Sequence, residues 1–111
     1  METGDKLQEV EMCYNLRNVY YSYGDFKKAV HYDERSLEIA KEASEGAVYG
    51  NLGNDYQSLG DLQKAIHYHE RHLEITRKLG DASSEGTAYG NLGSDYQGLG
   101  DFQKAIHYHE R

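Results

Sequence analysis

The sequence predicts an all-α fold, an α-solenoid fragment of antiparallel helical hairpins about two and a half repeats long. The first observation is a repeat: residues 51–71 recur at residues 91–111 with 18 of 21 positions identical, and a diverged copy occupies residues 15–35. The second is that apolar residues in each copy recur at helical spacing, and no segment alternates as a strand would. The third is that a hairpin of this size buries its apolar stripe only by stacking on a neighbour, so such units form arrays.

Each repeat unit is predicted to contain two helices. The first helix of the second unit ends at Gly60, a residue suited to the left-handed conformation, and Asp61 follows as the N-cap of the next helix. Gly24-Asp25 and Gly100-Asp101 form the same kind of helix boundary. The apolar faces of the two helices are predicted to comprise Tyr49, Leu52, Gly53 and Tyr56 in the first, and Leu62, Ala65, Ile66, His69, Leu73 and Ile75 in the second.

These boundaries place the whole chain, 1–111, in a single array. The first repeat covers about 4–43, the second about 44–80 and a truncated third about 81–111. The connection at 40–46 is four residues shorter than its counterpart at 76–86, and the missing residues include a Gly-Asp pair. Either Ser44 caps a new helix after a tight turn, or the two helices fuse into one of roughly 34 residues, about 50 Å long.

Composition narrows the range of partners and compartments. The chain has 12 Lys and Arg against 19 Asp and Glu, a net charge of −7, which argues against nucleic acid and against an anionic membrane surface. It shows no secretory signal and no apolar run long enough to cross a bilayer. Its one cysteine, Cys13, permits no internal disulfide and is expected to pack in a helix interface. We therefore expect a cytoplasmic protein.

We expect tyrosine rings to supply much of the buried area of the core. Leu, Ile, Val and Phe together make up only 20 residues, below the fraction usual for a folded domain, but the chain has 11 tyrosines. Each tyrosine buries a large ring while its hydroxyl stays polar, so tyrosine can replace the missing aliphatic residues.

The repeat resembles a known family. Leu52-Gly53, Tyr56, Gly60-Asp61 and Ala65 match the tetratricopeptide repeat (TPR) pattern. The 40-residue spacing is similar to the long repeat variant of Pins/LGN-type adaptors and of kinesin light chains. The resemblance implies a protein-interaction scaffold or adaptor, without catalysis, that binds a peptide segment of another protein on the concave face of the first helices.

In the TPR register, nine residues fall on the concave face. Asn and Gln side chains both donate and accept hydrogen bonds to a peptide backbone, glycines permit close approach, and tyrosines supply flat apolar contact. The alternative is that these are merely solvated polar positions. The candidate peptide-binding residues are Tyr14, Asn18, Tyr21, Gly50, Asn54, Gln57, Gly90, Ser94 and Gln97.

The expected partner is a protein or peptide segment with some basic residues, drawn by the acidic chain. A clamp for a C-terminal carboxylate is rejected: Asn18 and Asn54 match its Asn positions, but Gly90 and Ser94 stand where basic residues would be needed. Arg17 occupies the place of Gly53 and is expected either to extend into solvent or to loosen the first hairpin.

No catalytic or metal-binding arrangement is predicted. The sequence has no phosphate-binding loop, no nucleophile motif and no carboxylate pair at catalytic spacing. His67, His69 and His72 form H-x-H-x-x-H, but His67 and His69 cannot share a helical face. We expect His69 to pack between helices and His67 to face solvent, with no metal and no cofactor.

The alternative function is structural: a repeat fragment that self-associates into a domain-swapped or end-to-end homodimer. The third unit ends partway along its second helix, which would leave part of its first helix uncovered. A shortened hinge also favours exchange of elements between chains. The residues expected to act as hinge are Ala43, Ser44, Glu45 and Gly46.

Overall fold

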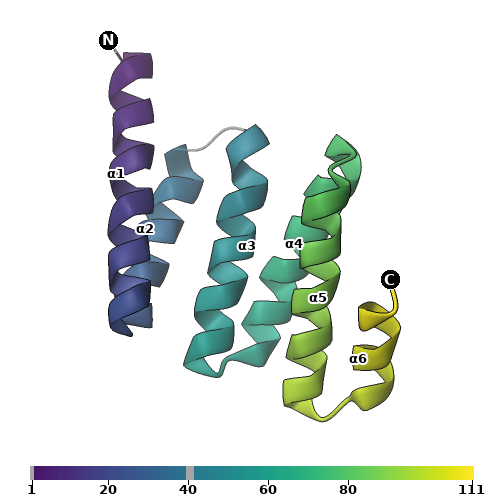
Figure 1. Cartoon of the computed structure of the whole chain (residues 1–111). Coiled ribbons are helices and arrows are strands. Elements are labelled where there is room, and N and C mark those ends of the chain that lie inside the picture. The colour runs from purple at the N-terminus through teal and green to yellow at the C-terminus, as the bar shows by residue number, and fades with distance from the viewer. Residues whose placement is uncertain (1, 40–41) are drawn as a thin grey trace.

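The computed structural model describes residues 2–39 and 42–111, with side chains for 8–39 and 45–111. In these ranges, six helices form three antiparallel hairpins that stack side by side (Figure 1). The described residues contain no strand, and they span 50 × 32 × 17 Å. The predicted all-α solenoid is confirmed. The hairpins are α1 (Glu2–Tyr23) with α2 (Phe26–Ile39), α3 (Glu42–Leu59) with α4 (Leu62–Leu79), and α5 (Ala82–Leu99) with α6 (Phe102–His109).

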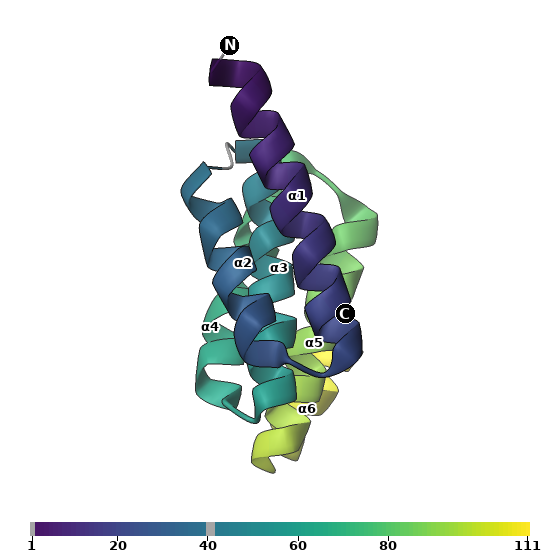
Figure 2. The same ribbon diagram turned by 90° about the vertical axis from the view of Figure 1, so that its left-hand side faces the viewer.

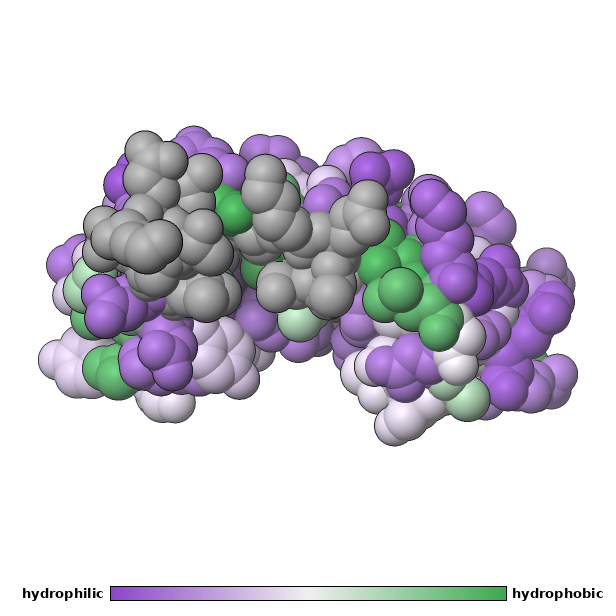
Figure 3. All heavy atoms as spheres, turned by 90° about the horizontal axis from the view of Figure 1, so that it is seen from above, coloured by the Kyte–Doolittle hydropathy of each residue, from purple (hydrophilic) through white to green (hydrophobic). Residues whose placement is uncertain are grey.

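The helices lie in two layers. The first helices of the hairpins, α1, α3 and α5, form one layer, and the second helices form the other (Figures 1 and 2). Each helix packs on its neighbours along the chain, and α3 also contacts α5. Viewed from above, the molecule has a hollow on the side of the first-helix layer (Figure 3). Within the described residues, no helix combines the length and the apolar character that a membrane span requires.

Gly-Asp pairs end one helix and begin the next, as the sequence predicts. Gly60 and Gly80 have φ angles of +84° and +69°, in the left-handed region that a side chain disfavours. The aspartate after each glycine accepts a hydrogen bond from a backbone N–H three residues later, at 3.2 Å for Asp61 and 3.1 Å for Asp81. The same arrangement at Asp25 and Asp101 gives every hairpin an equivalent turn.

The helices on either side of the shortened connection are separate elements that pack against each other. The alternative of one fused helix is wrong, because α2 ends at Ile39 and α3, which begins at Glu42, packs against α2. The expectation that Ser44 is the N-cap is also wrong, since α3 begins two residues before it. The side chains of Ala43 and Ser44 lie outside the described part of the chain. Among the other hinge candidates, Glu45 is half-buried and Gly46 is buried against Ile75.

Among the described side chains, two core clusters join successive hairpins. Val30 of α2 packs with Val48 and Leu52 of α3, and Leu73 of α4 packs with Ala88, Tyr89 and Leu92 of α5. Stacked tyrosines extend both clusters: Tyr68 lies between Tyr49 and Tyr56, and Tyr108 between Tyr89 and Tyr96, with ring centroids 5.6–6.2 Å apart. The tyrosines therefore supply the packing area that the few aliphatic residues lack.

Candidate peptide-binding site

Three of the nine candidate residues lie on α5 and remain accessible. Ser94 and Gln97 are exposed, and Gly90 is half-buried. A Cβ atom added at Gly90 would meet no other atom within 4 Å, so the space above it is open. These three positions are spaced three or four residues apart and share one face of the helix.

The candidates on α1 form a partly accessible surface. Tyr14 is 52% exposed. Asn18 is half-buried, and its Oδ1 accepts a hydrogen bond from Nη1 of Arg17 at 3.0 Å. The hydroxyl of Tyr21 lies 3.0 Å from Oγ of Ser58, a hydrogen bond that joins α1 to α3. Tyr14 is thus the α1 candidate with the most free surface.

The candidates on α3 mainly hold the helices together. Gly50 is buried, and an added Cβ would lie 3.1 Å from Nδ1 of His72 on α4. The expected close approach of a ligand at Gly50 is therefore wrong, because the His72 ring already fills that space. Asn54 pairs through Oδ1 with Nε2 of His69 at 3.1 Å, and Gln57 donates from Nε2 to Oδ1 of Asp95 at 2.7 Å.

A buried histidine and aspartate join the second hairpin to the third. Nδ1–H of His69 on α4 donates to Oδ2 of Asp95 on α5 at 2.5 Å, and both side chains are fully buried. The His69 ring lies directly over Gly53, where an added Cβ would be 2.3 Å from Cδ2 of the ring. The prediction that His69 packs between helices while His67 is exposed is confirmed. A glycine at position 53 is what makes room for the ring.

A buried arginine joins the first hairpin to the second. Nε of Arg17 on α1 donates to both oxygens of Asp33 on α2 at 3.1 Å, and Nη2 donates to Oδ1 of Asp55 on α3 at 2.7 Å. Arg17 is only 6% exposed, and its guanidinium also stacks over the Tyr21 ring. Both expectations for Arg17 are wrong: it neither extends into solvent nor loosens the hairpin, because two carboxylates pair with it inside the stack.

One positive group between two buried carboxylates leaves a net negative charge. Burial raises the pKa of Asp55, and the neighbouring Asp33 carboxylate raises it further. Oδ2 of Asp55 is buried and has no hydrogen-bond partner among the described residues. Burial also raises the pKa of Asp33, although Arg17 opposes that rise, and the pKa of Asp55 is raised to about 9.

The two junctions occupy the same positions of the repeat. Asp55 and Asp95 are 40 residues apart, and each is a buried acceptor on a first helix. The donor differs, since Arg17 and Asp33 stand 36 residues before Gly53 and His69. The sequence carries a signal for this difference, because two substitutions occur together in the first copy of the repeat. That copy has Arg17 in place of Gly53 and Asp33 in place of His69.

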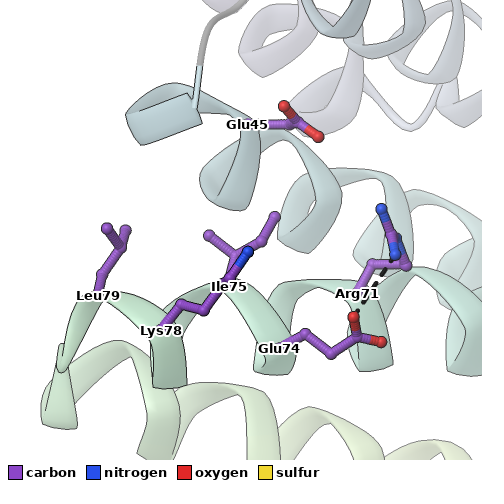
Figure 4. Close-up of a pocket in the computed structure, with 6 residues that line it drawn as sticks. All are labelled: Glu45, Arg71, Glu74, Ile75, Lys78 and Leu79. Carbon is purple, nitrogen blue, oxygen red and sulfur yellow. Dashed lines mark hydrogen bonds and ion pairs between the residues drawn. The ribbon is translucent and has the colours of Figure 1, made fainter.

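A separate cavity of about 480 Å³ lies between the start of α3 and the end of α4 (Figure 4). It contains an ion pair between Arg71 and Glu74 at 3.5 Å. The side chains around it carry two positive and two negative charges and include no arrangement of a nucleophile beside a base. In the described part of the chain, no three His, Cys, Asp or Glu side chains converge as a metal site would require. The lining residues are Glu45, Arg71, Glu74, Ile75, Lys78 and Leu79.

The stacked hairpins define the class of protein as a helical-repeat solenoid. A family model described as Tetratricopeptide repeat matches residues 44–111, and a second model with the same description matches residues 12–47. The chain belongs to the tetratricopeptide repeat family. Domains of this family generally mediate protein–protein interaction, and the fold is generally a non-catalytic scaffold.

Solved structures resemble the chain over nearly its whole length. The TPR domain of Arabidopsis FLU has a TM-score of 0.89 at 27% identity, covering 95% of this chain and 92% of that one. BtubC (BKLC) from P. vanneervenii has a TM-score of 0.85 at 31% identity, covering 92% of this chain and 44% of that one.

The kinesin-light-chain TPR-like repeats of Podosopora anserina have a TM-score of 0.76 at 24% identity, covering 89% of this chain and 51% of that one. At this identity the likeness shows the fold alone, and it is consistent with the resemblance to the long repeat variant. No match was found among curated protein sequences.

Proposed function

We propose that this chain is a cytoplasmic adaptor module that binds a peptide segment of a partner protein on the face formed by α1, α3 and α5. The observation that carries the proposal is the accessible polar and aromatic surface at matching positions of α1 and α5. These helices belong to the first-helix layer, the side on which Figure 3 shows a hollow. The most accessible residues of this surface are Tyr14, Ser94 and Gln97. The free, buried thiol of Cys13 fits a reducing compartment.

The partner segment in this proposal contains basic residues. The net charge of −7 favours the approach of a positively charged segment, and the exposed hydroxyl and amide groups of Ser94 and Gln97 can bond to its backbone. Asn54 and Gln57 contribute indirectly, since they fix His69 and Asp95 behind the surface.

The test starts from a displayed library of short random peptides selected on the unmodified chain. The affinity of an enriched peptide is then measured by calorimetry for the variant Tyr14→Ala/Gln97→Ala, which removes two exposed side chains of the proposed face. We expect a loss of at least about tenfold, equivalent to about 1.4 kcal/mol. The matched control is Gln63→Ala/Gln103→Ala, two exposed residues of the second-helix layer.

The control variant should keep the affinity of the unmodified chain, and circular dichroism should show that both variants remain folded. Equal affinities of the two variants would place the peptide elsewhere and contradict the proposal. A library that yields no enriched peptide would contradict it as well.

A further inference from the structure

His72 of α4 is a buried histidine whose Nδ1 atom has no polar neighbour. The residue is only 8% exposed, and Nδ1 has no hydrogen-bond partner among the described residues. The ring lies against α3, where a Cβ atom added at Gly50 would be 3.1 Å from Nδ1, and one added at Gly46 would be 3.9 Å from Cδ2. Within the described part of the chain, packing on α3 alone therefore holds this side of the ring.

This end of the second hairpin also contains the cavity of about 480 Å³. Ile75 lines the cavity one helical turn after His72 and lies over Gly46, whose added Cβ would be 3.0 Å from Cγ2 of the isoleucine. Figure 4 shows Glu45 of α3 across the cavity from Ile75. Glycine adds no packing area and weakens a helix, so contact between α3 and α4 is weak at this end.

The groups closest to His72 favour its neutral form. Burial lowers the pKa of His72 below its ordinary value of 6.5, and His69 on the same helix lowers it further. Asp81, which follows α4, acts in the opposite direction without cancelling this effect.

The carboxylates of the neighbouring elements are engaged elsewhere. Glu45 of α3 lines the cavity, and Glu85 of α5 pairs with Arg77 at 3.6 Å. Asp81 accepts a hydrogen bond as the N-cap of α5. A proton added to Nδ1 of His72 would therefore meet no acceptor among the described residues.

We propose that protonation of His72 opens the end of the second hairpin at which α3 begins and α4 ends. The neutral ring can keep Nδ1 unprotonated, whereas the imidazolium carries an N–H there and requires an acceptor. Because burying that charge is costly, the ring takes up the proton when α3 moves away from α4 and water reaches it. Acid thus loosens this end and exposes Ile75. The proposal goes beyond peptide binding and requires none of the exposed residues assigned to it.

The pH range of the opening follows from the direction of the pKa shift. In the open hairpin the imidazole titrates near 6.5, and in the closed hairpin its pKa is lower. Between these values opening takes up a proton, so the contribution of His72 to stability is complete above 6.5 and is lost as pH falls. Asp55 at the first junction has the opposite pH dependence and is therefore kept in every protein compared.

Native-state hydrogen exchange, followed by NMR at about pH 7.5 and about pH 5, tests the proposal. The unmodified chain is compared with His72→Gln, whose side chain does not titrate, and with His72→Ser, which copies Ser36, the buried residue at the same repeat position. Protection factors are corrected for intrinsic exchange at each pH. For the amides of residues 46–50, we expect them to fall at the acidic pH by at least about threefold more in the unmodified chain than in either variant.

The matched control is His67→Gln, which replaces an exposed histidine of the same helix and should keep the full acid response. NMR of the ring in the folded chain should show His72 titrating below 6.5, and titration at or above that value would contradict the proposal. An acid response that persists in both His72 variants, or that is lost in His67→Gln, would assign the effect to another group. An equal fall across all six helices would show that acid opens the whole stack and not this end of the hairpin.

Discussion

Asp55 and Asp95 are the residues on which the joining of the hairpins depends. A buried carboxylate requires a hydrogen-bond donor. Loss of the donor at either site leaves the carboxyl group buried without a partner, which is costly in free energy. Arg17 supplies the donor at one junction and His69 at the other. The arginine lies on a first helix and pairs with Asp33 of its own hairpin. The histidine lies on a second helix, and its ring fits only because Gly53 of the same hairpin has no side chain.

Exchanging the donor should convert one junction into the other. Arg17→Gly alone leaves the buried carboxyl groups of Asp33 and Asp55 without their hydrogen-bond donor. It should lower the free energy of unfolding by roughly 3–5 kcal/mol. The double variant Arg17→Gly/Asp33→His copies the Gly53 and His69 arrangement and should recover most of that loss. Urea unfolding followed by circular dichroism measures both.

Arg35→Ala serves as the control for this exchange, since Arg35 forms an exposed ion pair with Glu9, and its removal should change stability little. A double variant no more stable than Arg17→Gly would show that the two junctions are not equivalent.

The proton on Asp55 should make stability depend on pH. In the unfolded chain this carboxyl titrates near 3.8, whereas burial and Asp33 raise its folded-state pKa to about 9. Between these values unfolding releases a proton, so the contribution of Asp55 to stability is greatest at the acidic end and falls as pH rises to about 9. The slope reaches at most about 1.4 kcal/mol per pH unit for one proton.

Asp55→Asn should abolish this dependence. The amide oxygen still accepts from Arg17, and the amide nitrogen takes the place of the protonated oxygen. Unfolding free energies of the two proteins, measured in urea from pH 5 upward, should converge at low pH and separate as pH rises, with the variant becoming the more stable. Parallel curves would contradict a raised pKa at this residue.

Helices in this chain are specified locally, whereas their packing depends on residues far apart in sequence. Periodicity and the Gly-Asp pairs predict that helices end at Gly60 and Gly80, and α3 and α4 end directly before them, because capping involves neighbouring residues. The sequence leaves open whether α2 and α3 are separate helices, because the packing of α2 on α3 decides it and no Gly-Asp pair separates them. Ser44 lies inside the first turn of α3 for the same reason.

The glycines inside the helices have different roles, and two substitutions should separate them. Gly53→Ala places a methyl group 2.3 Å from the buried His69 ring and should lower the free energy of unfolding by about 1–3 kcal/mol. Gly86→Ala, where nothing lies within 4 Å, should raise it by about 0.5–1 kcal/mol because alanine favours the helix. Thermal melts of both variants against the unmodified chain provide the measurement. Destabilisation of equal size at the two sites would contradict the role assigned to Gly53.

The molecule as a whole is a linear stack, so stability should vary along it. In the part of the chain that the structure describes, the main contacts lie within hairpins and between successive hairpins. The shortest helix, α6, packs on α5 with Ala105 as its one buried residue among those described. The repeat in the sequence predicts the fold and the face of each helix that packs in the core. It does not predict the identity of the groups buried between hairpins, because Arg17 and Asp33 lie 16 residues apart in sequence and only their joint exchange between repeat copies connects them.

Native-state hydrogen exchange should reveal this gradient. We expect the backbone amides of α6 to exchange fastest among the six helices outside the terminal turns, and those of α3 and α4 slowest, because the central hairpin packs on both sides. Residue-resolved exchange by NMR at neutral pH gives the measurement. Uniform protection across all six helices would show that the array opens only as one cooperative unit.

The stacked tyrosines give the chain an optical signature of its own. The sequence contains no tryptophan, so its fluorescence arises mainly from 11 tyrosines. Tyr49, Tyr56 and Tyr68 form one stacked column in the second hairpin, and Tyr89, Tyr96 and Tyr108 form its counterpart in the third. Energy transfer between stacked rings makes tyrosine fluorescence anisotropy a label-free reporter of whether the hairpins are intact. Replacing Tyr68 or Tyr108 with Phe removes the central emitting ring of one column at a time, so the difference from the unmodified chain reports on that hairpin.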